Sequence, residues 1–202
     1  MILCVLFVGI GLGDTDAEAG EREMIQVPLT LHLASHRGKP VISKRRALAS
    51  VVRANEALRG YGIRLSVRGV ELLPQGYTEI KGGRSRIRLA KLARHDGTVH
   101  VFFVSHVALF SPRSGDRPVS GMHWRYHGVR KRIRQREYLV IARDAPSTTL
   151  VHEVGHAFGL NHHRALDNLM CSCRRGDRPG FTRRQGLRMR GGARRFMSRA
   201  VD

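Results

Sequence analysis

The sequence predicts an α/β fold in which a mixed sheet packs against a long helix within one domain. Segments with strand and helix patterns alternate along the chain, and neither an internal repeat nor a low-complexity tract interrupts them. A length of 202 residues suits one domain of ordinary size. Hydrophobic residues make up 42% and charged residues 26%, so the chain should bury a core. This composition disfavours wholesale disorder, collagen-like repeats and a multi-span membrane protein.

The first half of the chain supplies two expected strands and two expected helices. Residues 25–34 alternate apolar and polar side chains, as strands do. Ser43 is a suitable N-cap for an amphipathic helix that ends at Gly60. Residues 63–73 are expected to form a second strand, and residues 85–95 a short basic helix.

The second half begins with the best candidate for a central strand, the β-branched and aromatic run at residues 98–107. Residues 111–118 are rich in Ser, Pro, Arg and Gly and are expected to be a loop. A short edge strand is expected at 119–126, and a buried strand at 138–143. The pattern then changes from strand to helix.

Two helices are expected to complete the fold. Pro146 and Ser147 open the first, which runs to about Phe158. The second begins after Gly180, with Thr182 as its cap and Gln185 in the position of a capping-box partner. Its arginine-rich tail is expected to fray.

The N-terminus has the pattern of a secretory signal. Residues 1–12 form an apolar run too short to span a bilayer, and Ala17-Glu18-Ala19 offers a small-x-small cleavage site. We therefore expect a signal peptide at 1–19, a domain at 20–202 and a secreted or periplasmic protein without a membrane span after processing. The expected basic n-region is missing, which leaves open a start upstream of Met1 or a buried N-terminal strand instead.

The charge of the chain is unusual. Thirty-six Lys and Arg against 16 Asp and Glu give a net charge of +20. This surplus favours acidic partners such as nucleic acid, anionic lipid or acidic protein surfaces. Biased codon usage is the alternative explanation, because the arginines are scattered along the chain.

The most informative stretch is HEVGHAFGLNH at residues 152–162. Residues four apart lie on one face of a helix, so His152 and His156 present two imidazoles together, as a zinc ion requires. Glu153 lies beside them and can accept a proton from a metal-activated water without being a ligand.

Gly159 allows the left-handed conformation that ends a helix and turns the chain sharply. The turn would bring His162 to the same ion as a third ligand and leave the fourth position open, as in catalytic zinc sites. The alternative, histidines that cap a helix or line a core, is disfavoured because a core rarely holds so many polar groups without a partner.

This stretch, followed by Met170, resembles the signature of the metzincin zinc peptidases, HExxHxxGxxH with a methionine turn. The short interval between His162 and Met170 is similar to the matrixin branch. The resemblance implies a zincin-like fold: a mixed, mostly parallel twisted sheet over an active-site helix, followed by a small C-terminal subdomain. The subdomains would span about 25–162 and 163–202.

The resemblance also implies a function: a zinc endopeptidase with one catalytic Zn²⁺ at His152, His156 and His162, and with Met170 as an apolar base beneath the metal. An edge strand would border the cleft and bind an extended peptide by main-chain hydrogen bonds. Our candidate for it is Ser120 to Trp124, with an ordinary hairpin strand as an equal alternative. The expected partner is a protein or peptide substrate, with no nucleic acid, and the protein is expected to be a monomer.

Several residues depart from the metzincin pattern. His163 fits none of the branches after the third ligand and is an alternative ligand with the wrong offset. Ser172 stands where astacins and serralysins have an extra tyrosine ligand, and neither a cysteine switch nor acid-rich calcium loops are present. Cys171 and Cys173 are so close in sequence that a mutual disulfide would be strained, and buried apolar packing is the favoured interpretation. A second, structural zinc would have to use members of a scattered set: His95, His100, His106, His123 and His127.

Two further hypotheses come from the charge. The chain could be a basic anionic-surface or nucleic-acid binding protein on a metzincin scaffold with little catalysis. Alternatively, Arg174, Arg175 and Arg178 could give the peptidase a preference for acidic substrates, with solvated loop arginines as the competing interpretation.

Overall fold

The computed structural model describes residues 23–111, 115–173 and 179–199. The predicted signal peptide and the three arginines Arg174, Arg175 and Arg178 lie outside these ranges. Within the ranges, no helix combines the length and apolar character that a membrane crossing needs.

A five-stranded sheet forms the centre of the molecule, in the order β4-β1-β6-β10-β9. The strands are β1 (Ile25–Leu33), β4 (Ile63–Leu72), β6 (Val99–Val104), β9 (Gly121–Arg125) and β10 (Glu137–Ala142). Four of them run parallel, and β9 pairs with β10 antiparallel at one edge. The predicted edge strand at 119–126 and the mixed, mostly parallel sheet are thus confirmed.

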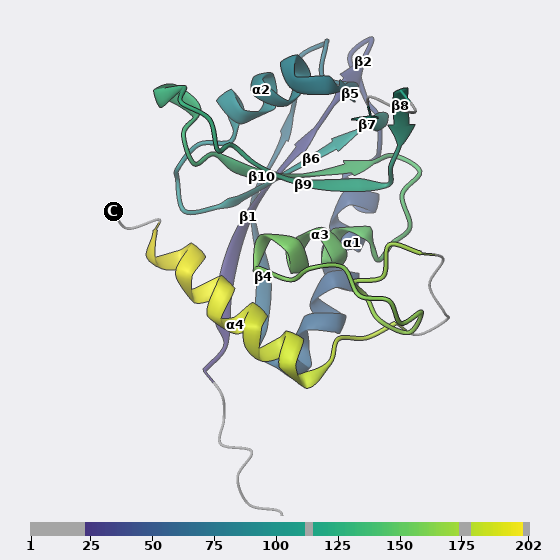
Figure 1. The fold of residues 1–202 in the computed structure, drawn as a ribbon. Coiled ribbons are helices and arrows are strands. Elements are labelled where there is room, and N and C mark those ends of the chain that lie inside the picture. Colours follow the sequence, from purple (N-terminus) through teal and green to yellow (C-terminus); the bar gives the residue numbers. More distant parts are fainter. Residues whose placement is uncertain (1–22, 112–114, 174–178, 200–202) are drawn as a thin grey trace, which may run out of the picture.

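Helices cover both faces of this sheet (Figure 1). The helices α1 (Lys44–Leu58), α3 (Thr149–Ala157) and α4 (Arg183–Ser198) lie on one face, and α2 (Gly82–Leu92) lies on the other. The predicted α/β class is confirmed. The proposed division into two subdomains stays a prediction.

Successive side chains of a strand point to opposite faces of the sheet, and apolar side chains occur on both faces here. The sheet is therefore buried on both sides. Leu29 and Leu31 of β1 point into the core shared with α1, α3 and α4. His32 of β1 and Phe102 of β6 point the other way, and the rings stack with their centroids 4.4 Å apart.

Capping residues fix where the helices begin. The Ser43 side chain accepts a hydrogen bond from the Arg46 backbone, which caps α1 as predicted. Thr182 and Gln185 form the predicted capping box at the start of α4. Later in α4, the buried Arg190 guanidinium donates to the carbonyls of Tyr61, Gly62 and Glu23, which ties the helix to the start of β1 and β4.

Two predictions about the middle of the chain are wrong. The run at 98–107 is two strands, because the backbone at Ser105 and His106 leaves the main sheet and donates to the Thr78 carbonyl. The predicted loop at 111–118 contains a strand instead. The additional sheet, in the order β5-β7-β8, consists of β5 (Glu79–Lys81), β7 (His106–Ser111) and β8 (Gly115–Pro118).

Other element bounds differ by a turn or less. The helix α2 begins at Gly82, before the predicted start, and α3 begins at Thr149 after a turn at Pro146. The remaining short elements are β2 (Ser35–His36), β3 (Lys39–Pro40) and the 3-10 turns η1 (Arg59–Tyr61) and η2 (Lys131–Ile133).

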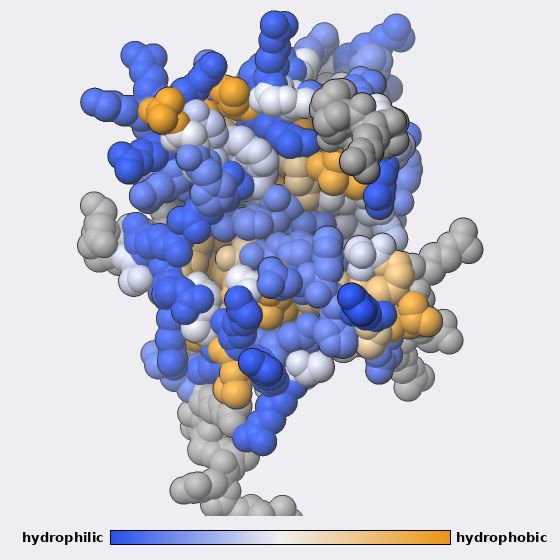
Figure 2. Space-filling view, viewed as in Figure 1, coloured by the Kyte–Doolittle hydropathy of each residue, from blue (hydrophilic) through white to orange (hydrophobic). Residues whose placement is uncertain are grey.

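The surface in the view of Figure 1 is mostly hydrophilic, and its apolar patches are small and separate (Figure 2). This agrees with the large charge surplus of the sequence and with a core that takes up most of the large apolar side chains.

Candidate metal centre

The first two residues of the centre come from α3, a short helix whose first seven residues are all buried. One turn separates His152 from His156, so their rings lie on the same side of the helix. Their Nε2 atoms are 3.2 Å apart. Two ligands of a tetrahedral zinc at the usual bond length lie about 3.3 Å apart, so this separation fits a shared ion.

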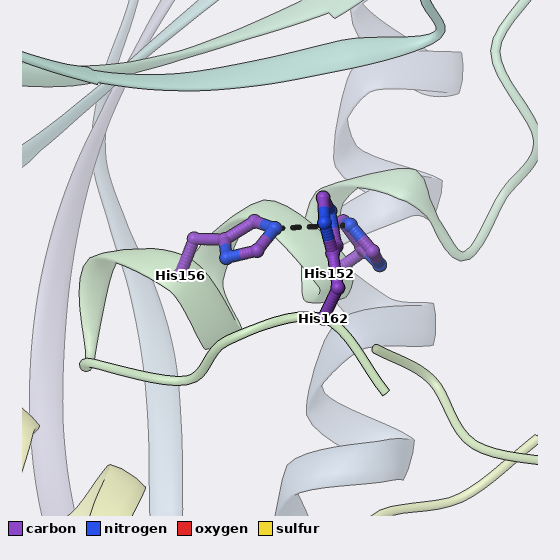
Figure 3. A group of neighbouring side chains, drawn as sticks. All are labelled: His152, His156 and His162. Atoms are coloured by element: carbon purple, nitrogen blue, oxygen red, sulfur yellow. Dashed lines mark hydrogen bonds between the residues drawn. The ribbon is translucent and has the colours of Figure 1, made fainter. Parts of the chain in front are cut away.

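The chain then turns back at Gly159, which has a φ of +90°. This left-handed backbone strains any residue with a Cβ, so glycine is needed here. Beyond the turn, the loop places His162 beside the other two rings (Figure 3). One ligand atom from each histidine lies within 4.8 Å of the others. No other group of three or more such ligand residues occurs in the part of the chain that the structure describes.

Backbone carbonyls orient the two helical imidazoles. The Nδ1 atom of His152 is 2.7 Å from the Leu169 carbonyl, and that of His156 is 2.8 Å from the Leu160 carbonyl. Since a carbonyl only accepts, each Nδ1 carries the proton and each Nε2 presents its lone pair to the common centre. Burial lowers the pKa of His156, which favours the neutral ring that a metal ligand must be.

The Glu153 side chain is buried and is not a member of the ligand group. It lies directly beneath Gly121 of β9, because a Cβ placed on that glycine would be 2.7 Å from Glu153 Oε1. The edge strand and the helix thus approach closely only because residue 121 has no side chain. Sequence reasoning placed Gly121 in the edge strand but missed this requirement, which no spacing in the sequence signals.

Met170 packs against α3. It is fully buried, and a Cβ on Gly155 would be 2.5 Å from its sulfur, so the helix glycine makes room for it. The turn is held by Asn168, whose Oδ1 accepts the Met170 backbone N–H at 2.9 Å. The Asn168 amide in turn donates to Gln185 Oε1 at 2.9 Å, which connects the turn to the cap of α4.

The alternative ligand His163 lies outside the group. It is exposed, and its Nδ1 accepts the Ala165 backbone N–H at 3.2 Å. Its own backbone N–H donates to the Met170 carbonyl, so His163 helps to hold the methionine turn through the main chain.

The favoured interpretation of Cys171 and Cys173 as separate packing residues is wrong, because the structure joins them in a disulfide. Their Cα atoms are 5.2 Å apart, within the usual range for a disulfide, since the chain bends sharply after Met170.

The histidines considered for a second zinc do not gather with one another in the described ranges. His100 pairs with His32 on the far face of the sheet, where the two ring nitrogens are 2.8 Å apart. His123 of β9 instead contacts a carboxylate, with its Nε2 at 2.6 Å from Glu137 Oε1.

Several solved structures have a fold similar to that of this chain. The chain is similar to metalloproteinase-II from Bacteroides fragilis (13% identity, TM-score 0.57), covering 85% of this chain but only 55% of that one. It is also similar to archaemetzincin from Methanopyrus kandleri (16% identity, TM-score 0.56, 84% and 96% covered). Mirolysin, solved in complex with compound 9, gives 13% identity and a TM-score of 0.57, with 87% and 96% covered. No protein-family profile and no curated protein sequence matches the chain.

Proposed function

We propose that this protein is a zinc-dependent endopeptidase of the metzincin type. The observation that carries the proposal is the gathering of three imidazoles from a helix and a glycine turn, with a buried carboxylate from the same helix under an edge strand. His152, His156 and His162 would hold the ion, and Met170 would form the apolar base beneath it. The zinc metallopeptidase folds found by comparison support this assignment.

The outer edge of β9 is the proposed substrate-binding strand. It is the last strand of the five-stranded sheet, with β10 as its only partner among the described strands. An extended peptide can add to such an edge through main-chain hydrogen bonds. Glu153 lies beneath the first residue of this strand, Gly121, so a peptide on the edge would pass close to the carboxylate.

In the proposed mechanism, bound zinc supplies Lewis acidity that makes water nucleophilic near neutral pH and polarises a carbonyl. Glu153 accepts the proton of the attacking water and delivers it to the amine that leaves when the peptide bond breaks. The carbonyls of Leu160 and Leu169 keep two of the imidazoles in the tautomer that this chemistry needs.

Secretion into the periplasm or medium, a monomeric state and a place near the matrixin branch belong to the same proposal. The apolar segment at 1–12 with its small-residue cleavage site supports export. The short interval between His162 and Met170 supports the matrixin branch.

Hydrolysis of an unstructured protein substrate tests the proposal, measured with and without a chelator and after zinc is returned. We expect Glu153→Gln to lower kcat by at least about 100-fold while zinc stays bound, since removal of a general base typically has effects of this size. Glu56→Gln, at an exposed carboxylate of α1 paired with Arg53, is the control and should leave activity unchanged. Activity that survives both chelation and Glu153→Gln contradicts the mechanism.

The charge of +20 favours one alternative, a protein that binds anionic surfaces or nucleic acid on the same scaffold with little catalysis. Binding to such polyanions that weakens steeply with salt, without peptide cleavage by the zinc-loaded protein, would support it.

A further inference from the structure

A small cavity, about 80 Å³ in volume, lies at the start of β10, the strand that pairs with the edge strand β9. Residues that follow α2, the start of β10 and the end of α4 line it, among them Arg94, His95, Glu137, Phe196 and Arg199. In Figure 1 the end of α4 lies on the same side of the molecule as the end of β9 that leads into the loop before β10. The space is large enough for a carboxylate-sized group.

Glu137 connects this cavity to the metal centre. On β9, Gly121, His123 and Arg125 alternate onto the sheet face that carries α3, while Met122 and Trp124 pack on the opposite face. Glu137 pairs in register with Arg125 and accepts a hydrogen bond from His123. A row of side chains therefore leads from Glu153, past His123 and Arg125 of β9, to Glu137 at the cavity.

The cavity and its border carry more positive than negative charge. Arg125 and Arg199 lie 4.0 and 3.8 Å from Glu137 Oε2, longer than a hydrogen bond, while His123 takes the other oxygen. Arg199 lines the cavity, as does Arg94, whereas Arg125 lies at its border beside Glu137. The nearby Asp96 carboxylate is turned toward Thr98 and accepts its backbone N–H. Two arginines of the lining and a third at its border therefore outnumber the one carboxylate of the lining, that of Glu137.

Antiparallel addition to β9 would set the direction of a bound peptide. Glu153 must deliver a proton to the leaving amine, and it lies under Gly121. With the scissile bond at Gly121, an antiparallel peptide has its N-terminal half along β9 toward Arg125 and its C-terminal half beyond Gly121. Four residues of strand span about 13 Å, so the cavity faces roughly the second to fourth residue before the scissile bond.

We propose that this cavity is a substrate subsite, lined by Arg94 and Arg199 and bordered by Arg125, that binds an acidic side chain on the N-terminal side of the scissile bond. The inference rests on the proposed peptidase function and names its substrate class. Glu137 acts as a positioning residue that holds Arg125 and Arg199 at the border of the site.

A peptide series tests the subsite directly. Each peptide shares one scissile sequence and carries Glu, Gln or Lys at one of the four positions before the cleaved bond. We expect the zinc-loaded enzyme to show a kcat/KM about threefold to tenfold higher for Glu than for Gln at the preferred position, because the arginines are partly exposed. The preference should shrink as salt is raised.

Charge reversal supplies the matched comparison. The double variant Arg94→Glu and Arg199→Glu should turn the preference from Glu toward Lys, measured as the ratio of the kcat/KM values for the Glu and Lys peptides. Arg53→Glu, on α1 and paired with Glu56, should retain the preference for Glu. Equal cleavage of Glu and Gln peptides by the unmodified enzyme, or a preference that survives the double variant, overturns the subsite.

A binding measurement separates this inference from the proposed function. The zinc-loaded Glu153→Ala protein should bind the Glu peptide about threefold to tenfold more tightly than the Gln peptide, whether or not the unmodified protein cleaves either one. Absence of cleavage together with this selectivity overturns the peptidase and keeps the subsite. Cleavage of the peptides without this selectivity in binding overturns the subsite and keeps the peptidase.

Discussion

Two histidines buried on the far face of the sheet predict that stability falls as the solution becomes acidic. His32 and His100 are each 3% exposed, and His32 Nε2 lies 2.8 Å from His100 Nδ1. A carboxylate stands at each end of the pair, with Glu71 at 3.1 Å from His32 and Asp96 at 3.2 Å from His100. Neither carboxylate offsets the burial: desolvation, followed by the charge of His100, lowers the pKa of His32 from 6.5 to about 4.

The sign and size of the effect follow from this shift. Because the folded pKa is lowered, the folded state disfavours the charged ring, and its contribution to stability is complete above pH 6.5. It is lost as pH falls from 6.5 to about 4, and a shift of this size corresponds to about 3 kcal/mol in the free energy of unfolding. Burial also lowers the pKa of His100, so its protonation acts in the same direction.

Urea unfolding of the metal-free protein between pH 7.5 and 4 measures this effect without a contribution from zinc release. His32→Gln removes the titrating ring, so its free energy of unfolding should fall less over the same range, by a difference approaching 3 kcal/mol. His36→Gln, at an exposed histidine of β2, should follow the unmodified protein. An unmodified protein whose stability is flat from pH 7 to 4.5, or His32→Gln with the same slope, would refute the reasoning.

Three substitutions test the close contacts around the metal centre. Gly121→Ala would place a Cβ 2.7 Å from Glu153 Oε1, so kcat should fall at least about tenfold with zinc still bound. An unchanged kcat would show that β9 and α3 separate easily. Gly155→Ala would place a Cβ 2.5 Å from the Met170 sulfur. Because the methionine side chain is flexible, the free energy of unfolding measured in urea titrations should fall by only about 1 to 2 kcal/mol. A larger loss would mean that Met170 cannot move. Asn168→Ala leaves the buried Met170 N–H without its acceptor, so we expect the free energy of unfolding to fall by about 1 to 3 kcal/mol. We also expect weaker zinc binding in a competition titration. Zinc affinity equal to that of the unmodified protein would contradict this role for the turn.

Local chemistry explains which features could be predicted from sequence. The caps at Ser43 and Thr182 depend on residues three positions apart, so the pattern alone indicates them. His152 and His156 share a helix face by periodicity, and Gly159 marks the turn that brings His162 to them. Each of these contacts lies within about ten residues of sequence.

Features that depend on distant parts of the chain could not be predicted in this way. The split of the run at 98–107 occurs because Thr78, far upstream, accepts hydrogen bonds from Ser105 and His106. The His32 and His100 pair forms because β1 and β6 are neighbours in register. Strand periodicity places each of these residues on a sheet face but does not say which strand lies beside it.

X-ray absorption at the zinc edge, combined with metal analysis, shows whether three imidazoles hold one zinc ion. We expect one zinc per chain, with three imidazole nitrogens at about 2.0 to 2.1 Å and a remaining light-atom ligand, and a loss of this signal in folded His162→Ala. A protein that takes up no zinc, or a His162→Ala variant with unchanged coordination, would contradict it.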